Sequence, residues 1–146
     1  TLHRVGFANQ SRSEHRLDGL ALRDAYITAT LRCAPPQNHP IPSEILSCRP
    51  FLLQELRLLG SIRVLIALGR IAFDGALHAI SEAFQLLISP RPAFAHNEAY
   101  SFSNGLTLIA SFHPSQQNTQ TGRLTRAMFN SVFDHAQDLL EGGGSE

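Results

Sequence analysis

The sequence contains no lysine and no tryptophan, and it has only two cysteines among its 146 residues. All twelve basic residues are therefore arginine, and twelve acidic residues balance them to a net charge of zero. A neutral total gives no overall attraction to nucleic acid. The absence of lysine is explained as simply by a GC-rich genome as by any function.

Long apolar runs are also missing. No stretch of about 18 apolar residues occurs, so no transmembrane helix and no membrane partner are expected. No basic segment followed by an apolar one marks a secretory signal. Two cysteines are too few for a disulfide scaffold, and we expect a cytoplasmic location. The chain starts at Thr1, and "TLHRVGFANQ" resembles the end of a helix, so we expect a longer protein.

Common catalytic signatures are absent as well. There is no G-x-G-x-x-G fingerprint, no P-loop, no H-E-x-x-H pair and no G-x-S-x-G elbow. The sequence therefore does not support dinucleotide binding at such a motif, a zinc protease of that type or Ser-His-Asp chemistry.

Apolar residues make up 43% of the chain, which is enough for the core of one domain over residues 1–141. Strands are predicted at Ala25–Leu31, Val64–Leu68 and Gly105–Phe112, because these runs are apolar or rich in β-branched residues. Helical spacing follows each strand, with Ser43 and Thr125 as expected N-caps and a stop at Gly60. Residues 142–146 are expected to form a flexible tail. This alternation predicts an α/β fold, a three-layer α/β/α sandwich around a central parallel sheet.

The loops that follow the three strands should meet at one edge of that sheet. Ligands bind outside the carboxyl ends of strands in such folds. The expected edge residues are Asn38, in the proline-rich loop Cys33–Pro42, together with Gly69 and His113.

The loop "SFHPSQQNTQTGRLT" contains many uncharged hydrogen-bonding side chains and no acid. Pro114 biases His113 toward extended backbone, and Ser115 is suited to bond nearby backbone. The acidic residues stop at Glu98 and resume only at Asp134. Amide and hydroxyl groups of this kind contact phosphate, sugar or base edges. A plain polar surface loop with a capping histidine is the alternative.

The two cysteines, Cys33 and Cys48, allow two interpretations. They are two buried apolar thiols, or they are half of a four-cysteine site for zinc or an iron–sulfur cluster.

Three segments together resemble the uracil-DNA glycosylase superfamily, in its bacterial family 5 (B-type) branch: "YITATLRCAPPQNHPIPSEILSC", "VLIALG" and "SFHPSQQNTQTGRLT". The resemblance covers about residues 2–140. It implies a four-stranded parallel sheet, of which three strands fall in this chain, and about two thirds of the usual domain. It also implies base excision repair: hydrolytic removal of uracil, and of other deaminated bases, from single- or double-stranded DNA by a monomeric, nucleoid-associated enzyme.

The resemblance also implies roles for individual residues. His113 would donate to O2 of the base, and Asn38 would contact the base or the abasic sugar. Cys33 and Cys48 would be two of four ligands to a structural [4Fe–4S] cluster. DNA and substrate contacts would come from Ser115, Gln116, Gln117, Asn118, Thr119, Gly122 and Arg123.

The chain departs from the family pattern at three points. Ala29 stands where family 4 relatives carry a uracil-reading Asn, which implies broader base specificity. His96-Asn97 replaces a frequent His-Gly. The motif expected to supply the water-orienting residues and the other two cysteines is absent. Two other functions therefore compete with the enzyme: a catalytically incomplete DNA-binding member of the same fold, and a small-molecule α/β protein that uses the same edge.

Overall fold

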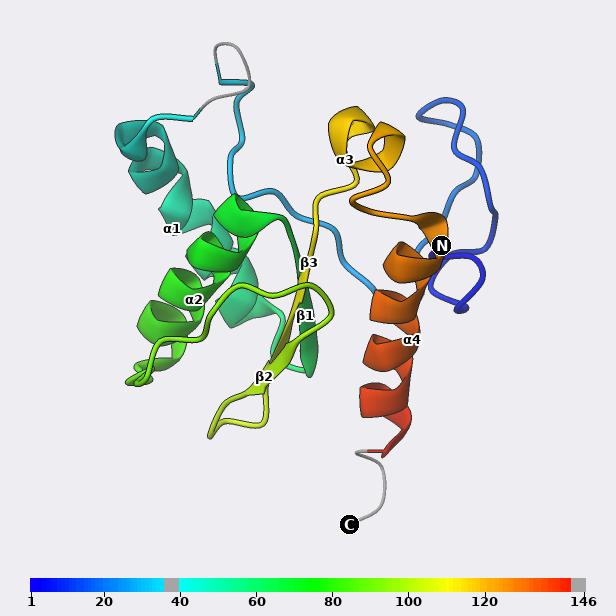
Figure 1. Ribbon diagram of the computed structural model, residues 1–146. Coiled ribbons are helices and arrows are strands. Elements are labelled where there is room, and N and C mark those ends of the chain that lie inside the picture. Colours follow the sequence, from blue (N-terminus) through cyan, green and yellow to red (C-terminus); the bar gives the residue numbers. More distant parts are fainter. Residues whose placement is uncertain (36–39, 143–146) are drawn as a thin grey trace.

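The computed structural model describes residues 1–35 and 40–142. Its elements, in chain order, are α1 (Pro42–Leu58), β1 (Val64–Leu68), α2 (Arg70–Phe84), β2 (Ala99–Ser101), β3 (Thr107–Ser111), α3 (Gln116–Gln120) and α4 (Arg126–Gly142) (Figure 1). Among these described helices, none combines the length and apolar character that crossing a bilayer requires. Of the expected tail, residues 142–146, Gly142 is the last residue of α4, and residues 143–146 lie outside the described residues.

The central sheet has the strand order β1-β3-β2. β1 and β3 are parallel and in register from Val64–Thr107 to Leu68–Ser111. β2 is antiparallel to β3, so the sheet is mixed and the expectation of a purely parallel sheet is wrong. β2 was not predicted, because three residues between two loops give no periodic pattern.

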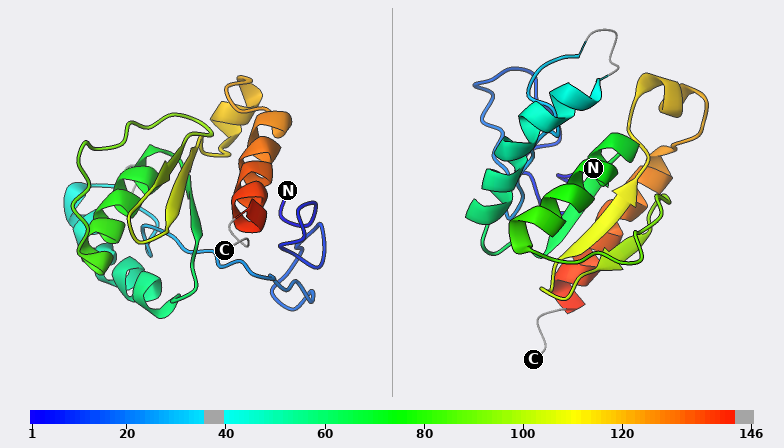
Figure 2. Two further views of the ribbon diagram at one scale, coloured as in Figure 1. Left: turned by 90° about the horizontal axis from the view of Figure 1, so that it is seen from below. Right: turned by 90° about the vertical axis from the view of Figure 1, so that its left-hand side faces the viewer.

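The layers agree with the predicted α/β architecture. α1 and α2 lie on one face of the sheet and α4 covers the other (Figures 1 and 2). All five residues of β3 are buried between these layers, as the continuous apolar run predicts. One core cluster, which includes Phe73, Ile80 and Leu108, lies under α1 and α2, and a second, which includes Ile109 and Val132, lies under α4.

The predicted strand Ala25–Leu31 is wrong. No residue in this segment is in a strand, and Tyr26 and Ile27 are 57% and 67% exposed. β-Branched and aromatic residues favour a strand only where a neighbouring strand supplies backbone partners, and no described strand pairs with this segment.

Side-chain bonds fasten the same segment to α1 instead. The Tyr26 hydroxyl donates to Oε1 of Glu55 over 2.9 Å, and Thr28 and Arg32 also donate to this carboxylate. Burial alone would raise the pKa of Glu55, but the bonds from Thr28, Tyr26 and Arg32 outweigh it and hold the pKa below its ordinary value. The segment therefore depends on an ionised Glu55.

The segment also crosses α2 at a glycine. A Cβ atom on Gly75 would lie 2.7 Å from Cγ2 of Thr30, which is closer than real Cβ contacts. Glycine in the middle of a helix lowers helix stability, and here it leaves the space that Thr30 occupies.

The helix boundaries differ slightly from the predicted ones. α1 starts at Pro42 with Ile41 as its N-cap, so Ser43 lies inside the helix rather than at its cap. Glu44 accepts a hydrogen bond from the Ile41 backbone at 3.0 Å, and the helix continues through Pro50. At α4 the prediction is confirmed, because the Thr125 hydroxyl accepts from the Met128 backbone at 3.1 Å.

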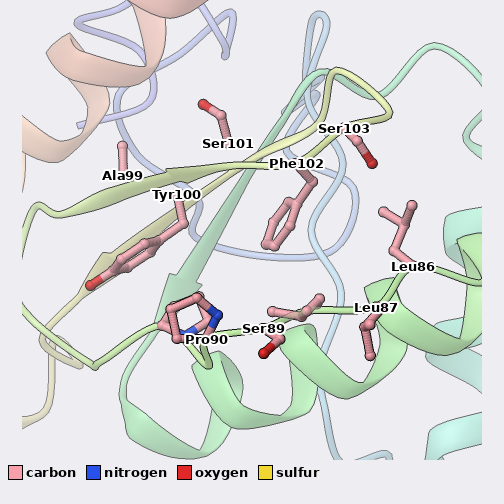
Figure 3. A pocket seen from close by; sticks show the side chains of 11 residues that line it. Leu86, Leu87, Ser89, Pro90, Ala99, Tyr100, Ser101, Phe102 and Ser103 are labelled. Atoms are coloured by element: carbon pink, nitrogen blue, oxygen red, sulfur yellow. The ribbon is translucent and has the colours of Figure 1, made fainter.

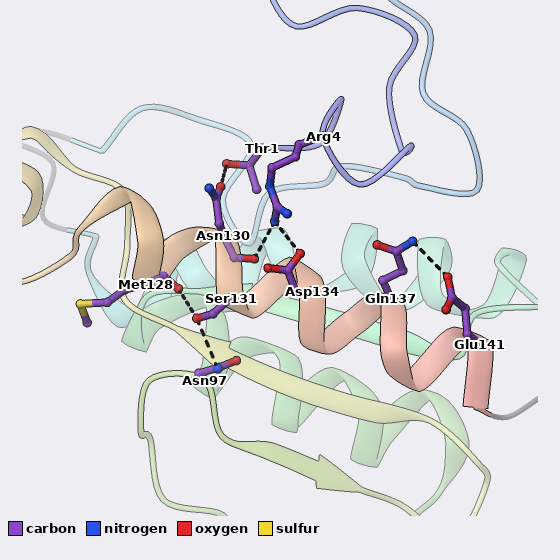
Figure 4. Close-up of polar contacts among 9 residues, drawn as sticks. All are labelled: Thr1, Arg4, Asn97, Met128, Asn130, Ser131, Asp134, Gln137 and Glu141. Carbon is purple, nitrogen blue, oxygen red and sulfur yellow. Dashed lines mark hydrogen bonds and ion pairs between the residues drawn. The ribbon is translucent and has the colours of Figure 1, made fainter.

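The first residues of the chain pack on α4. Residues 2–6 form hydrogen-bonded turns rather than the expected helix end. Figure 4 shows how Arg4 reaches the helix: it pairs with Asp134 at 2.6 Å and donates to the Asn130 carbonyl at 3.1 Å, while Thr1 donates to the Asn130 side chain at 2.9 Å. These contacts hold residues far apart in sequence along one side of the molecule.

Candidate functional site

The predicted meeting of Gly69 and His113 at the carboxyl edge of the sheet is confirmed. A Cβ atom on Gly69 would lie 3.1 Å from Cβ of His113 and 3.6 Å from its ring atom Cδ2. The Gly69 N–H donates to the Ser111 carbonyl at 2.7 Å, which continues the β1–β3 pairing by one residue. Gly69 has a φ of 95°, so glycine satisfies both the backbone and the close approach.

The main chain of His113 is held firmly, whereas its ring is exposed. The His113 carbonyl accepts from the Ser115 N–H at 2.8 Å and from Nδ2 of Asn118 at 2.9 Å. The ring makes no hydrogen bond with any described residue. An imidazole on a fixed backbone with both nitrogens open is suited to donate to a ligand.

The polar loop after His113 is more ordered than the sequence indicates, because it contains the short helix α3. The Ser115 hydroxyl caps this helix by accepting from the Asn118 N–H at 3.2 Å. Thr119 donates back to the Ser115 carbonyl at 3.0 Å, and Thr121 donates to the Gln117 carbonyl at 2.7 Å. The expected backbone bonding of Ser115 is thus confirmed, and these short side chains maintain the shape of the loop.

The longer side chains of this segment face outward. Gln116, Gln117 and Arg123 are exposed, and Gly122 lets the chain turn with a φ of 72°. Arg123 lies over the Phe112 ring at 5.0 Å and forms no ion pair with a described residue. The site therefore presents amides and one cation beside His113.

The two cysteines differ in environment: Cys33 is exposed and Cys48 is buried in α1. The Arg32 N–H contacts Sγ of Cys48 at 3.4 Å, so the residue before Cys33 touches the second thiol. Two thiols suit a thiolate-bound metal in part, but the described residues contain no group of three or more metal-ligating side chains.

Asn38, which was predicted to lie at the same edge, falls outside the described residues. Ala29 is exposed on the segment that leads to Cys33.

Two cavities of the described chain lie away from His113. One, of about 440 Å³, is lined by the segment Leu86–Pro90 and by β2, with Tyr100 and Phe102 pointing into it (Figure 3). The other, of about 280 Å³, lies in the loop Gln10–Asp18. The candidate site is an exposed edge rather than an enclosed pocket.

Sequence reasoning missed the residues beneath His113. Phe112 and His96 stack with ring centroids 4.9 Å apart, and His96 accepts the Phe112 N–H. The sequence offers two signals: Phe112 directly precedes His113, and His96 falls at the frequent His-Gly position of the family that the chain resembles. Neither signal indicates that the two rings, 16 residues apart, stack on each other.

Comparison with known proteins gives consistent matches. The family model of the uracil DNA glycosylase superfamily matches residues 1–137. A type-5 uracil-DNA glycosylase of Thermus thermophilus is 45% identical over 138 residues, which is 94% of this chain and 60% of that protein. Another, of Mycobacterium bovis, is 41% identical over 139 residues, or 94% of this chain and 50% of that protein.

A third type-5 uracil-DNA glycosylase, of Pyrobaculum aerophilum, is 36% identical over 132 residues, or 90% of this chain and 54% of that protein. The chain thus spans about half to three fifths of these relatives. The matched region includes the sheet edge, His113 and α3. The chain belongs to the uracil DNA glycosylase superfamily.

Proposed function

We propose that the protein containing this chain removes uracil from DNA by hydrolysing the bond between the base and deoxyribose. One observation carries the proposal: an exposed imidazole, His113, stands on a fixed backbone at the carboxyl edge of the sheet, beside a row of uncharged polar side chains. Relatives that share this region are named type-5 uracil-DNA glycosylases. Uracil is the main substrate proposed. Other deaminated bases are proposed as well, because Ala29 lacks the amide with which family 4 relatives read uracil.

The chemistry suits a hydrogen-bond donor at this position. The base must first leave the helical stack, at a cost of a few kcal/mol. Water then bonds to the sugar C1′, the bond from C1′ to the base breaks, and its electron pair stays on the base. The proton that the water loses passes to solvent, and the released base takes up a proton from solvent. Negative charge grows on the base O2, and a ring N–H of His113 donates to it. One such donor contributes about 3–4 kcal/mol in comparable sites.

The segment after His113 is proposed to hold the DNA. Gln116 and Gln117 have exposed amides for phosphate or groove contacts, and Arg123 offers a cation. Ser115, Asn118 and Thr119 act mainly by shaping α3 through the bonds described above, and Gly122 lets the backbone approach the DNA. Asn38 is proposed to contact the base or the abasic sugar.

Cys33 and Cys48 are proposed as two ligands of a [4Fe–4S] cluster. Iron–sulfur clusters of this type are held by four thiolates, so two ligands must come from outside the described residues. The cluster would supply a structural anchor when bound, and it takes no part in the chemistry proposed for His113. A monomer that acts on single- or double-stranded DNA in the cytoplasm, near the nucleoid, is proposed as the working form.

The test compares His113→Ala with His78→Ala in the intact protein, since His78 is an exposed histidine on α2. Single-turnover release of uracil should fall about 100- to 1,000-fold in the first variant, and affinity for uracil-containing DNA should change far less. The His78 variant should match the unmodified protein in both measurements. DNA binding without any release by the unmodified protein would contradict the enzymatic proposal.

A further inference from the structure

The strand pairing between β2 and β3 changes at Asn97, just before β2 begins. The Ala110 N–H donates to the Glu98 carbonyl at 2.9 Å, while the Ala110 carbonyl accepts from the Asn97 N–H at 2.7 Å. Two residues therefore face one, which is the pattern of a β-bulge. Asn97 has a φ of 63°, a conformation that glycine adopts readily and that asparagine tolerates.

Before Asn97 the backbone no longer pairs with β3. N–H groups of β3 alternate between its two edges, so the Phe112 N–H points to the same side as that of Ala110. No backbone carbonyl of a described residue accepts it. Nδ1 of His96 accepts it instead, at 3.1 Å. The imidazole thus occupies the place of the next carbonyl in the ladder.

The same imidazole also fixes the Phe112 ring. The two rings stack at 4.9 Å with an angle of 15° between their planes. Because Nδ1 accepts a hydrogen bond, the neutral ring carries its proton on Nε2. This atom is buried and has no hydrogen-bond partner among the described residues. Burying a polar atom without a partner is unfavourable, so the position of this ring is not explained by its own hydrogen bonding.

Phe112 connects the two ends of the candidate site. It directly precedes His113, and its ring lies 5.0 Å beneath the guanidinium of Arg123. Asn118 and Ser115 hold the His113 carbonyl from the other side. The backbone of His113 is therefore fixed both through His96 and through α3.

We infer that His96 is a positioning residue, which holds Phe112 so that the His113 ring is directed at the departing base. The inference rests on the proposed function. His96 should therefore affect catalysis only through His113. The hydrogen bond accepted by Nδ1 of His96 should contribute more to catalysis than the stacking of its ring on Phe112.

Two variants of the intact protein separate these contributions. His96→Phe keeps a stacking ring and loses the acceptor, whereas His96→Asn keeps an oxygen near the position of Nδ1. Single-turnover uracil release should fall about 100-fold in His96→Phe, as for a catalytic group displaced by about 1 Å. His96→Asn should recover most of that loss, and both should bind uracil DNA almost as tightly as the unmodified protein. His78→Phe, the same change at an exposed site, is the control.

The decisive comparison adds His96→Phe to His113→Ala. The added change should lower release by less than about twofold, because residues that act as a unit are not additive. A full further loss would overturn the inference, as would a His96→Phe protein of unchanged activity. If the unmodified protein releases no uracil, the proposed function fails by itself. In that case NMR tests the positioning role directly, through hydrogen exchange of the Phe112 amide and the chemical shifts of the His113 ring. Both must change in His96→Phe and stay near their original values in His96→Asn.

Discussion

Gly69 lies directly against His113, with only 3.1 Å between a Cβ atom built on Gly69 and Cβ of His113. The two residues follow the neighbouring parallel strands β1 and β3, which explains why they meet. A side chain at residue 69 would press on His113, which would have to shift by a few tenths of an ångström. The identity of residue 69 should therefore affect chemistry at His113.

Gly69→Ala is predicted to lower uracil release by about 10- to 100-fold, because the new methyl group displaces His113. DNA affinity should change by much less. Gly105→Ala is a matched control, since Gly105 also has a positive φ, of 84°, but no heavy atom lies within 4 Å of its Cβ position. That variant should lose stability and keep its release rate per folded molecule. Equal kinetic losses in both variants would show that backbone strain, not the contact with His113, is responsible.

Gly75→Ala is predicted to destabilise the protein by about 1–2 kcal/mol, although alanine is the better helix former. The added methyl group would overlap Cγ2 of Thr30 at 2.7 Å. Denaturant unfolding of four proteins tests this: unmodified, Gly75→Ala, Thr30→Ser and the double variant. Serine lacks Cγ2, so Gly75→Ala should become neutral or stabilising in the Thr30→Ser background. Destabilisation of the same size in both backgrounds would disprove the steric explanation.

Acid should weaken the attachment of segment Ala25–Leu31 to α1. The folded-state pKa of Glu55 is lowered, so its ionised form stabilises the fold above the ordinary carboxyl pKa of about 4.3. This stability is lost as the pH falls through the lower, folded-state pKa.

Glu55→Gln should therefore show a smaller decrease in unfolding free energy between about pH 5 and pH 3 than the unmodified protein. Tyr26→Phe removes one donor and should give an intermediate slope. Chemical denaturation at a series of pH values measures this, and an unchanged slope in Glu55→Gln would assign the acid sensitivity to other carboxyl groups.

Cys33→Ser is predicted to remove bound iron and visible absorbance, and to reduce solubility, before it affects the chemical step. Cys48→Ser should behave in the same way if the thiols share one cluster. Iron and sulfide analysis of the purified protein checks both variants. Undiminished iron in either variant would remove that cysteine from the ligand set.

The strongest predictions from sequence concern elements whose signal is local and continuous. The apolar runs of β1 and β3 indicated buried strands; β3 is buried throughout, whereas β1 is a strand in which only Ala67 is fully buried. Thr125 marked the start of α4. Because parallel strands end at the same edge, the meeting of Gly69 with His113 followed from the sequence pattern alone.

The missed features depend on partners that sequence does not reveal. Segment Ala25–Leu31 has strand-forming residues but no described strand beside it, so side-chain bonds to Glu55 decide its path. α3 is too short for a periodic signal and depends on its Ser115 cap. The role proposed for His96 depends on the bulge at Asn97, which has a φ of 63°, and on a hydrogen bond to a residue 16 positions away.

Within the His113–Arg123 segment, short polar side chains bond to the backbone and long ones are exposed, and this difference has a thermodynamic consequence. The hydroxyls of Ser115, Thr119 and Thr121 and the amide of Asn118 already bond to backbone, so these bonds hold the main chain without the proposed contact with DNA. The long glutamine and arginine side chains and the His113 ring remain to lose rotamer entropy on contact. Binding of DNA to this segment should therefore involve little loss of main-chain entropy. The segment would adapt to different DNA sequences by changing side-chain rotamers, without a change in its backbone.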